Sequence, residues 1–271
     1  MDSRIIVVLG DGELQEGQIW ESLPGAARDN LKELTIIVDG NGIQSDTWVT
    51  NTSPLGNLKS RVEGSGWKFL ECDGHDLQSL RSVINRQQDA PTFIFAKTIK
   101  GAGINSMMAF APEGKFYKFH SGSLDDSNYS YSVSELLARM QHNIAPSLEL
   151  DAGKALSIEP DLSPKARPES FVTAWSELLP KAMRSNSNLV VLDADLSYDT
   201  GTYIAREEFS ERYIQAGIAE QDMVSLAGTL ALSGFIPIVH SFATFMSMRP
   251  TEQIFNNLTE RTRIIYCGFL A

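Results

Sequence analysis

The chain has 271 residues, of which 42% are hydrophobic, and this length and composition are typical of a globular protein of about two domains. Its 34 acidic residues outnumber its 23 basic residues and give a formal net charge of −11, which argues against a nucleic acid partner. Only two cysteines are present, each inside an apolar run, so the sequence indicates free thiols rather than disulfides or a zinc site.

Targeting and membrane signals are not found in the sequence. The amino terminus enters an apolar β-type run directly, without the features of a signal peptide. A run of about 18 apolar residues, as a membrane-spanning helix requires, does not occur. We therefore expect a cytoplasmic protein without a membrane partner.

Two short apolar runs near the amino terminus, Ile5–Leu9 and Leu34–Val38, each end in a turn of glycine and acidic residues. Both have the β-branched composition of buried parallel strands, and their spacing fits one β-α-β unit. The turns contain Gly10, Asp11 and Gly12 after the first run and Asp39, Gly40 and Asn41 after the second. Because parallel strands end at one edge of a sheet, Asp11 and Asn41 are expected to lie together, as oxygen ligands suited to Mg²⁺.

The first half of the chain continues as an alternation of helix and strand. Periodicity predicts helices over residues 16–30, 54–65 and 77–84 and strands over residues 67–71 and 92–96. Such alternation favours a parallel α/β layer. The loop Lys97–Gly103 is similar to a P-loop, but its lysines precede its glycines, so we exclude a nucleotide triphosphatase.

The composition changes between residues 125 and 167, where one helix is predicted, Val133–Asn143, and the remainder lacks periodicity, as in an interdomain linker. A second α/β half is predicted from Pro168 onward. Its expected elements are a helix starting at residue 168, strands over 188–192, 213–215 and 236–240, and an apolar helix from the region of Glu220 to Ser233. The predicted fold class is α/β, with two parallel-sheet domains.

The motif GDGELQEGQIWE, followed by DGNGI, resembles the diphosphate-binding signature of thiamine-diphosphate enzymes in its transketolase form. Other motifs of that family follow in order: DGHD, KTIKGAG, a histidine near a glycine, and GIAEQDM. The resemblance implies the carboxyl-terminal part of a diphosphate-binding domain over residues 1–124, a linker over 125–167, and the amino-terminal part of a pyrimidine-binding domain over 168–271. Thiamine diphosphate and Mg²⁺ are the implied cofactors.

By this resemblance, residues of the first half bind the diphosphate end of the cofactor. Asp11, Asn41 and the backbone carbonyl of Ile43 would ligate Mg²⁺, and Gly10 and Gly12 would shape the diphosphate loop. Two further residues of this half are assigned in the same way, namely Glu16, where the family keeps a glutamate at the dimer interface, and His120, as a contact to diphosphate or donor-substrate oxygens.

In the second half the resemblance assigns Glu220 to N1′ of the aminopyrimidine, which makes it the principal catalytic candidate. By itself, a glutamate at this position is typical of a helix start, where the helix dipole favours it. Phe242 and Phe245 would stack on the aminopyrimidine, although a phenylalanine pair at this spacing is more often part of a core. Candidate substrate contacts are Asp195 and Arg249, and Arg249 has an acidic interface group as its alternative partner.

Three interpretations of function follow. The first is a transketolase-type enzyme that moves a two-carbon ketol unit from a ketose or its phosphate to an aldose. Its site would form where the diphosphate half of one subunit meets the pyrimidine half of another, in a homodimer or a hetero-oligomer whose partner supplies the family's flanking regions. The second is a non-catalytic remnant or assembly module of the same fold, and the third is an enzyme resembling 1-deoxyxylulose-5-phosphate synthase.

Overall fold

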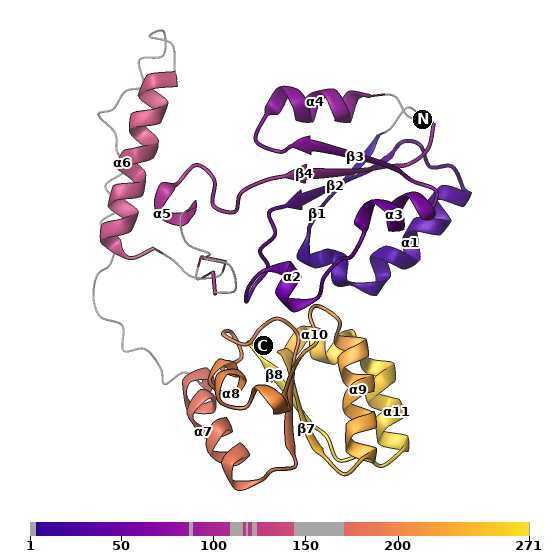
Figure 1. Cartoon of the computed structure of the whole chain (residues 1–271), viewed down its shortest axis with the longest axis vertical. Helices are drawn as coiled ribbons and strands as arrows, with labels where there is room; N and C mark the ends of the chain where they lie inside the picture. Colours follow the sequence, from indigo (N-terminus) through magenta and orange to yellow (C-terminus); the bar gives the residue numbers. More distant parts are fainter. Residues whose placement is uncertain are drawn as a thin grey trace.

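Two four-stranded parallel sheets, one in each half of the sequence, organise the computed structural model (Figure 1). The structure describes residues 4–86, 89–108, 116–117, 119–120, 124–143 and 171–270. The strand order is β1-β2-β4-β3 in the first sheet and β6-β5-β7-β8 in the second. The α/β fold class predicted from the sequence is therefore confirmed.

The first sheet places the two glycine-rich turns beside each other. Its strands are β1 (Ile5–Gly10), β2 (Leu34–Gly40), β3 (Lys68–Asp73) and β4 (Thr92–Lys97). Its helices are α1 (Gly17–Arg28), α2 (Val49–Thr52), α3 (Leu58–Gly64), α4 (Leu77–Asn85) and α5 (Asn105–Met108), with a 3-10 turn η1 (Gly12–Gln15). β1 pairs in parallel with β2, with Gly10 opposite Asp39, so both turns leave the same edge as predicted.

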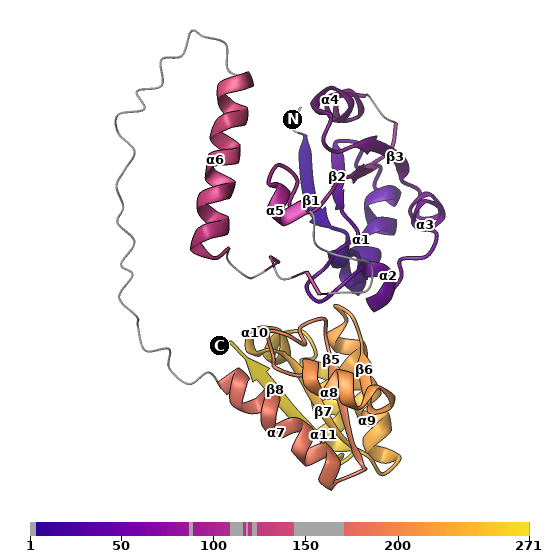
Figure 2. The same cartoon turned by 60° about the vertical axis from the view of Figure 1, so that its left-hand side comes forward.

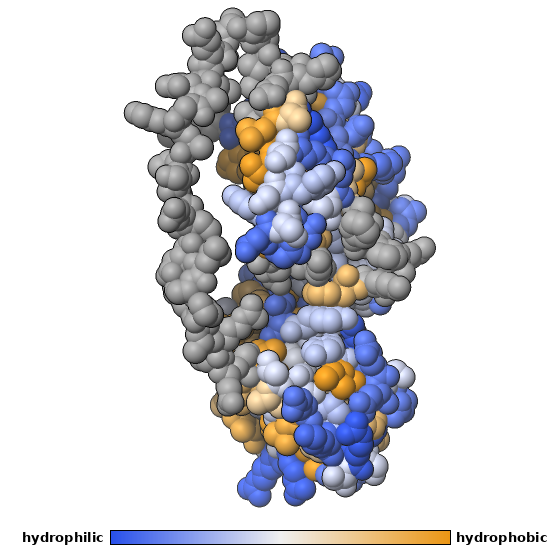
Figure 3. Space-filling model, turned by 90° about the vertical axis from the view of Figure 1, so that its left-hand side faces the viewer, coloured by the Kyte–Doolittle hydropathy of each residue, from blue (hydrophilic) through white to orange (hydrophobic). Residues whose placement is uncertain are grey.

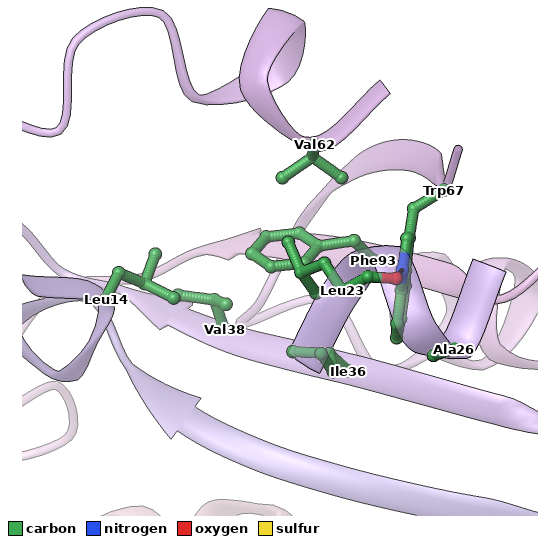
Figure 4. Packing of buried hydrophobic residues seen from close by; sticks show 8 residues of the cluster. All are labelled: Leu14, Leu23, Ala26, Ile36, Val38, Val62, Trp67 and Phe93. Atoms are coloured by element: carbon green, nitrogen blue, oxygen red, sulfur yellow. Dashed lines mark hydrogen bonds between the residues drawn. The ribbon is translucent and has the colours of Figure 1, made fainter. Parts of the chain in front are cut away.

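A core of eight buried side chains packs one face of this sheet against α1 and α3 (Figure 4). The fully buried Phe93 lies at its centre, with Val62 on one side and Ile36 on the other. The indole N–H of Trp67 donates to the backbone carbonyl of Leu23 at 2.8 Å, which satisfies the one polar atom that tryptophan brings into the core. The core residues are Leu14, Leu23, Ala26, Ile36, Val38, Val62, Trp67 and Phe93.

The segment predicted as one helix over residues 54–65 forms its helix, α3, only from Leu58. Gly56 lies just before it with a φ of +64°, a left-handed conformation that interrupts any helix. Asn57 then caps α3, because its side-chain oxygen accepts the Ser60 N–H at 3.0 Å. The prediction was wrong in ignoring this glycine and its capping neighbour.

The helix predicted over Val133–Asn143 begins earlier, as α6 (Asp126–Asn143). Asp125 supplies the start signal, since its carboxylate accepts the N–H of Asn128 at 2.9 Å. Serine hydroxyls along the first turns donate to carbonyls four residues earlier, as Ser132 does to Asn128 at 2.7 Å. The serine-rich composition, which favoured a loop, is thus accommodated inside the helix.

In the second half, the sheet is covered on both faces. The strands are β5 (Leu189–Asp193), β6 (Tyr213–Gln215), β7 (Ile236–Phe242) and β8 (Ile265–Phe269). The helices are α7 (Phe171–Ser185), α8 (Tyr203–Glu208), α9 (Glu220–Leu232), α10 (Ala243–Met248) and α11 (Thr251–Thr259), with a 3-10 turn η3 (Ser210–Arg212). One core packs the sheet against α9, and another packs it against α7. The predicted helix start at Pro168 and most of the predicted linker lie outside the described residues.

Hydrophobic residues remain on the surface of both halves, as separate patches among hydrophilic ones on the face shown in Figure 3. β1 is an edge strand of its sheet, and within the described part of the chain it pairs only with β2. Ile5 is 58% exposed and Val8 is 68% exposed, so side chains on both faces of this strand reach the surface. Of the helices described, none is long and apolar enough to cross a membrane.

Candidate active site

A cavity of about 680 Å³ is lined by residues of both halves of the chain. The predicted site residues that line it are Glu16, His120, Glu220, Phe242, Phe245 and Arg249. Glu21 and Gln221, two other positions in the family motifs, line it as well. The structure thus brings together the residues assigned to the pyrimidine end with two assigned residues of the first half.

Glu220 is the first residue of α9, and only 2% of it is exposed. The amino end of a helix favours a carboxylate, which explains a charged side chain in this buried place. Its Oε1 accepts a hydrogen bond from the Ser241 hydroxyl at 3.3 Å. Arg249 Nη1 donates to both carboxylate oxygens, at 2.9 and 3.0 Å. Glu220 is therefore a buried carboxylate held by a hydroxyl and a guanidinium.

The two predicted phenylalanines lie next to each other on the wall of the cavity. Phe242 ends β7 and Phe245 lies in α10, and their ring centres are 5.6 Å apart at an angle of 43°. The guanidinium carbon of Arg249 lies 4.0 Å from the centre of the Phe245 ring. The guanidinium of Arg249 therefore lies over the Phe245 ring while it binds Glu220.

Glu16 belongs to the first half and reaches the same arginine. Arg249 Nη1 lies 2.6 Å from Glu16 Oε1. The contact is an ion pair rather than a hydrogen bond, since this buried oxygen accepts none. Burial raises the pKa of Glu16 above its ordinary value; Arg249 opposes this rise, and the charges of Glu220 and Glu13 add to it. Arg249 therefore joins two acidic side chains from the two halves of one chain. Its predicted contact with substrate or with an acidic interface group stays a prediction.

At the diphosphate end, the three predicted metal ligands are engaged in local contacts. The Asp11 carboxylate accepts the Gly42 N–H at 2.5 Å, and burial raises the pKa of Asp11 while backbone N–H groups oppose the rise. Asn41 Oδ1 accepts the N–H of Ile43 at 2.9 Å. The Ile43 carbonyl accepts a hydrogen bond from Lys100 Nζ at 3.0 Å. Carboxylate, amide and carbonyl oxygens are therefore contributed by neighbouring loops.

The donor set fits a hard cation. Within the described ranges, no group of three or more His, Cys, Asp or Glu side chains could hold a metal ion. The predicted set contains only one such side chain, Asp11, together with amide and carbonyl oxygens, which are donors that Mg²⁺ accepts. Lys100 shows that a cation fits against the Ile43 carbonyl. Burial lowers the pKa of Lys100, whereas the charges of Asp11, Asp39 and Asp195 raise it. Mg²⁺ itself stays a prediction.

The two glycines of the first turn have different surroundings. The Gly10 N–H donates to Glu13 Oε2 at 2.6 Å, which closes the turn at the end of β1. Gly12 is buried, and a Cβ there would lie 3.0 Å from the Cβ of Gln44 and 3.6 Å from a methyl carbon of Ile218. Gly12 therefore allows the first turn to approach Gln44, in the loop after β2, closely.

His120 links the two ends of the site. Its Nδ1 lies 2.8 Å from Lys100 Nζ, and its Nε2 lies 3.2 Å from the Ser45 hydroxyl. Burial lowers the pKa of His120, the Lys100 charge lowers it further, and Asp46 opposes both. A neutral imidazole accepts a hydrogen bond from the ammonium group, which matches this arrangement. The residues that follow, Ser121 and Gly122, lie outside the described part of the chain.

Two buried aspartates join the halves, and sequence reasoning identified only Asp195. Its carboxylate oxygens accept the N–H groups of Ser45 at 3.0 Å and Asp46 at 3.2 Å. Asp46 in turn accepts the Ser197 N–H at 3.0 Å and pairs with Arg206 at 3.2 Å. Both oxygens of Asp195 are thus engaged between the halves, and its predicted role as a substrate contact stays a prediction.

Other residues that sequence reasoning missed lie inside or beside the recognised motifs. Gln15 of the QEGQ segment accepts the N–H of Ile218 at 2.9 Å, which ties the first motif to the second half. Gly217 has a φ of +74°, and a Cβ there would lie 2.6 Å from the Gln15 Oε1 atom. Position within the motif was the available signal for Gln15, Asp46 and Lys100, whereas their partners depend on the tertiary arrangement.

All these contacts form within one chain. Figures 1 and 2 show the first half, with α2 at its lower end, lying against the end of the second half that carries α10. The resemblance led to an expectation of sites shared between two subunits. The structure places the corresponding residues together in a single chain, and a two-subunit arrangement stays a prediction.

Comparisons with known proteins identify the same family along the chain. The thiamine diphosphate binding domain of transketolase matches residues 1–117, and the pyrimidine binding domain of transketolase matches residues 169–271. Human transketolase is 28% identical over 278 aligned residues, which cover 98% of this chain and 43% of the relative. Mouse transketolase-like protein 2 has the same identity and coverage over 279 residues. The chain spans less than half the length of these relatives.

Solved structures with similarity to the chain include transketolases from Campylobacter jejuni and Leishmania mexicana. Each is 20% identical with a TM-score of 0.36; the first comparison covers 99% of this chain and 47% of the solved chain, and the second covers 98% and 46%. The two domain matches together cover most of the sequence, and each falls on one of the two parallel sheets. The chain therefore belongs to the transketolase family and contains its thiamine diphosphate-binding and pyrimidine-binding domains.

Proposed function

We propose that this chain takes part in a transketolase-type transfer of a two-carbon ketol unit from a ketose or its phosphate to an aldose. The cofactors would be thiamine diphosphate and Mg²⁺. When bound, the cofactor would supply the carbon nucleophile that accepts the ketol unit. The proposal includes a cytoplasmic location and an oligomer in which other chains supply the regions that the relatives have in addition.

One observation carries the proposal: Glu220 and Phe245 both contact Arg249, and both line the cavity that Glu16 and His120 also line. A buried carboxylate can hold a proton at N1′ of an aminopyrimidine, and an aromatic face beside it can orient the ring. Asp11, Asn41 and the Ile43 carbonyl would hold the metal and the diphosphate at the other end. Human transketolase, whose name states this activity, aligns over 98% of the chain.

The proposal is tested by calorimetric titration of thiamine diphosphate into the full chain, with and without Mg²⁺. We expect binding that depends on Mg²⁺ and that weakens about tenfold when Phe245 is replaced by alanine, because the stacking face is lost. Phe255→Ala is the matched control, since Phe255 lies on α11 and is 64% exposed. Titrations are repeated with any protein that co-purifies. Absence of binding in both preparations would refute the proposal.

A further inference from the structure

Arg249 makes the two contacts that the proposed function assigns to the aminopyrimidine ring. Its Nη1 donates to both oxygens of Glu220, at 2.9 and 3.0 Å. Its guanidinium carbon lies 4.0 Å from the centre of the Phe245 ring. A guanidinium group is flat, delocalised and rich in N–H donors, so it binds a carboxylate and an aromatic face in the way a protonated or amino-bearing heterocycle does.

We propose that Arg249 competes with the aminopyrimidine for Glu220 and Phe245, and therefore sets the affinity of the chain for its cofactor. The inference rests on the proposed function. Both oxygens of Glu220 accept hydrogen bonds from Arg249, and Oε1 also accepts one from Ser241, so N1′ has to compete with Arg249 for the carboxylate. A ring face covered at 4.0 Å by a guanidinium likewise has no room for a second flat group. Cofactor binding thus requires Arg249 to move.

Arg249 also contacts a second carboxylate, that of Glu16, which can hold it when it leaves Glu220. Glu16 Oε1 lies 2.6 Å from Arg249 Nη1 and accepts no hydrogen bond in the present arrangement. The Arg249 side chain is 33% exposed on the wall of the cavity, so it is not locked in place by packing. A rotation that keeps the existing contact with Glu16 would leave the charge of Arg249 paired while it releases Glu220 and Phe245.

Without the cofactor, the arginine has a stabilising role. Glu220 is buried and Glu16 is 24% exposed, and burial together with the charge of Glu220 raises the pKa of Glu16. Removing the cation between them leaves two acidic groups facing each other in a partly dry cavity, which destabilises the fold. Arg249 therefore has opposite effects on stability and on cofactor affinity. A purely structural residue would change both in the same direction.

The test compares Arg249→Met with the wild-type chain in two measurements. Calorimetric titration of thiamine diphosphate in the presence of Mg²⁺ is expected to show binding about tenfold tighter in the variant, since the competitor is gone. Thermal unfolding without cofactor is expected at a lower temperature in the variant. The exposed Arg263→Met serves as the matched control and should change neither quantity.

Two further variants keep the inference testable if Arg249→Met folds poorly. Glu16→Gln combined with Arg249→Met removes one of the facing charges, and Arg249→Lys keeps the positive charge but lacks the flat face. Both are expected to bind the cofactor more tightly than the wild type. Equal or weaker binding in the folded variants would overturn the competition while leaving the proposed function intact. Failure of the wild-type chain and its variants to bind the cofactor would overturn both.

Discussion

Replacing Glu220 by glutamine is expected to slow the exchange of the cofactor's C2 proton with solvent deuterium by at least about 100-fold, the lower range for loss of a general acid or base. Glu220 is 2% exposed and faces the cavity beside Phe245, so its carboxyl group is placed to hold and release a proton at the aminopyrimidine. An amide keeps the shape and a hydrogen bond but cannot take up that proton. Ketol transfer, which depends on the same step, is expected to fall in parallel.

Measuring the affinity for thiamine diphosphate distinguishes slower proton exchange from a failure to bind the cofactor. Arg249 retains Glu16 as a charged partner in the variant, so the fold and the Mg²⁺-dependent binding measured by calorimetry are expected to persist. Glu252→Gln is the matched control, because Glu252 is an exposed glutamate in the first turn of α11. Exchange within a few fold of the wild-type rate in Glu220→Gln, measured by NMR on the bound cofactor, would remove Glu220 from its assigned role.

Strand pairing was the part of the fold that the sequence predicted best. The β-branched runs ending at Leu9 and Val38 are each followed by a glycine-containing turn. They pair in parallel as β1 and β2. The first residues of helices were predicted less well where a capping side chain or a single glycine, rather than the overall composition, sets the helix start. Asp125 begins α6 in a serine-rich segment, and the left-handed Gly56 delays α3, because caps and single backbone conformations are weak signals in a periodicity analysis.

In the candidate site, the motifs located residues but not their partners. Glu220 and Phe245 each belong to a recognisable motif. Their position close to Glu16, however, depends on how the two separately packed halves meet. No apolar core is shared between the halves in the described clusters, so hydrophobic patterning carries no information about their contact. The two halves are joined by hydrogen bonds of buried polar groups such as Asp46 and Asp195. No local sequence pattern predicts these contacts.

The buried carboxylates between the two halves are expected to make the free energy of unfolding depend on pH. Burial, followed by the charge of Asp46, raises the pKa of Asp195 to about 7 from its ordinary value of 3.8. Its backbone N–H partners at Ser45 and Asp46 only partly offset this rise. Asp193, also buried, has a pKa raised to about 7 by burial and by Asp46. Arg206 pairs with Asp46 at 3.2 Å, and burial lowers the pKa of Lys100, while the charge of Asp195 raises it.

Because the folded chain holds the Asp195 proton more tightly than the unfolded chain, its contribution to stability is complete below pH 3.8 and is lost as the pH rises through about 7. The unfolding free energy is therefore expected to fall between about pH 4 and pH 7. Asp195→Asn should reduce this fall by on the order of 4 kcal/mol, with the remainder due to Asp193.

Asparagine suits the site for this test. Asp195 has a φ of +63°, a left-handed conformation that asparagine tolerates well. Its carbonyl can accept one of the two backbone N–H groups, so any constant loss of stability is separable from the change with pH. Urea unfolding at a series of pH values measures the slope directly, and the exposed Asp222→Asn should keep the wild-type slope. An unchanged slope in Asp195→Asn would show that Asp195 is ionised throughout this range and that the two halves are joined by a permanently charged carboxylate.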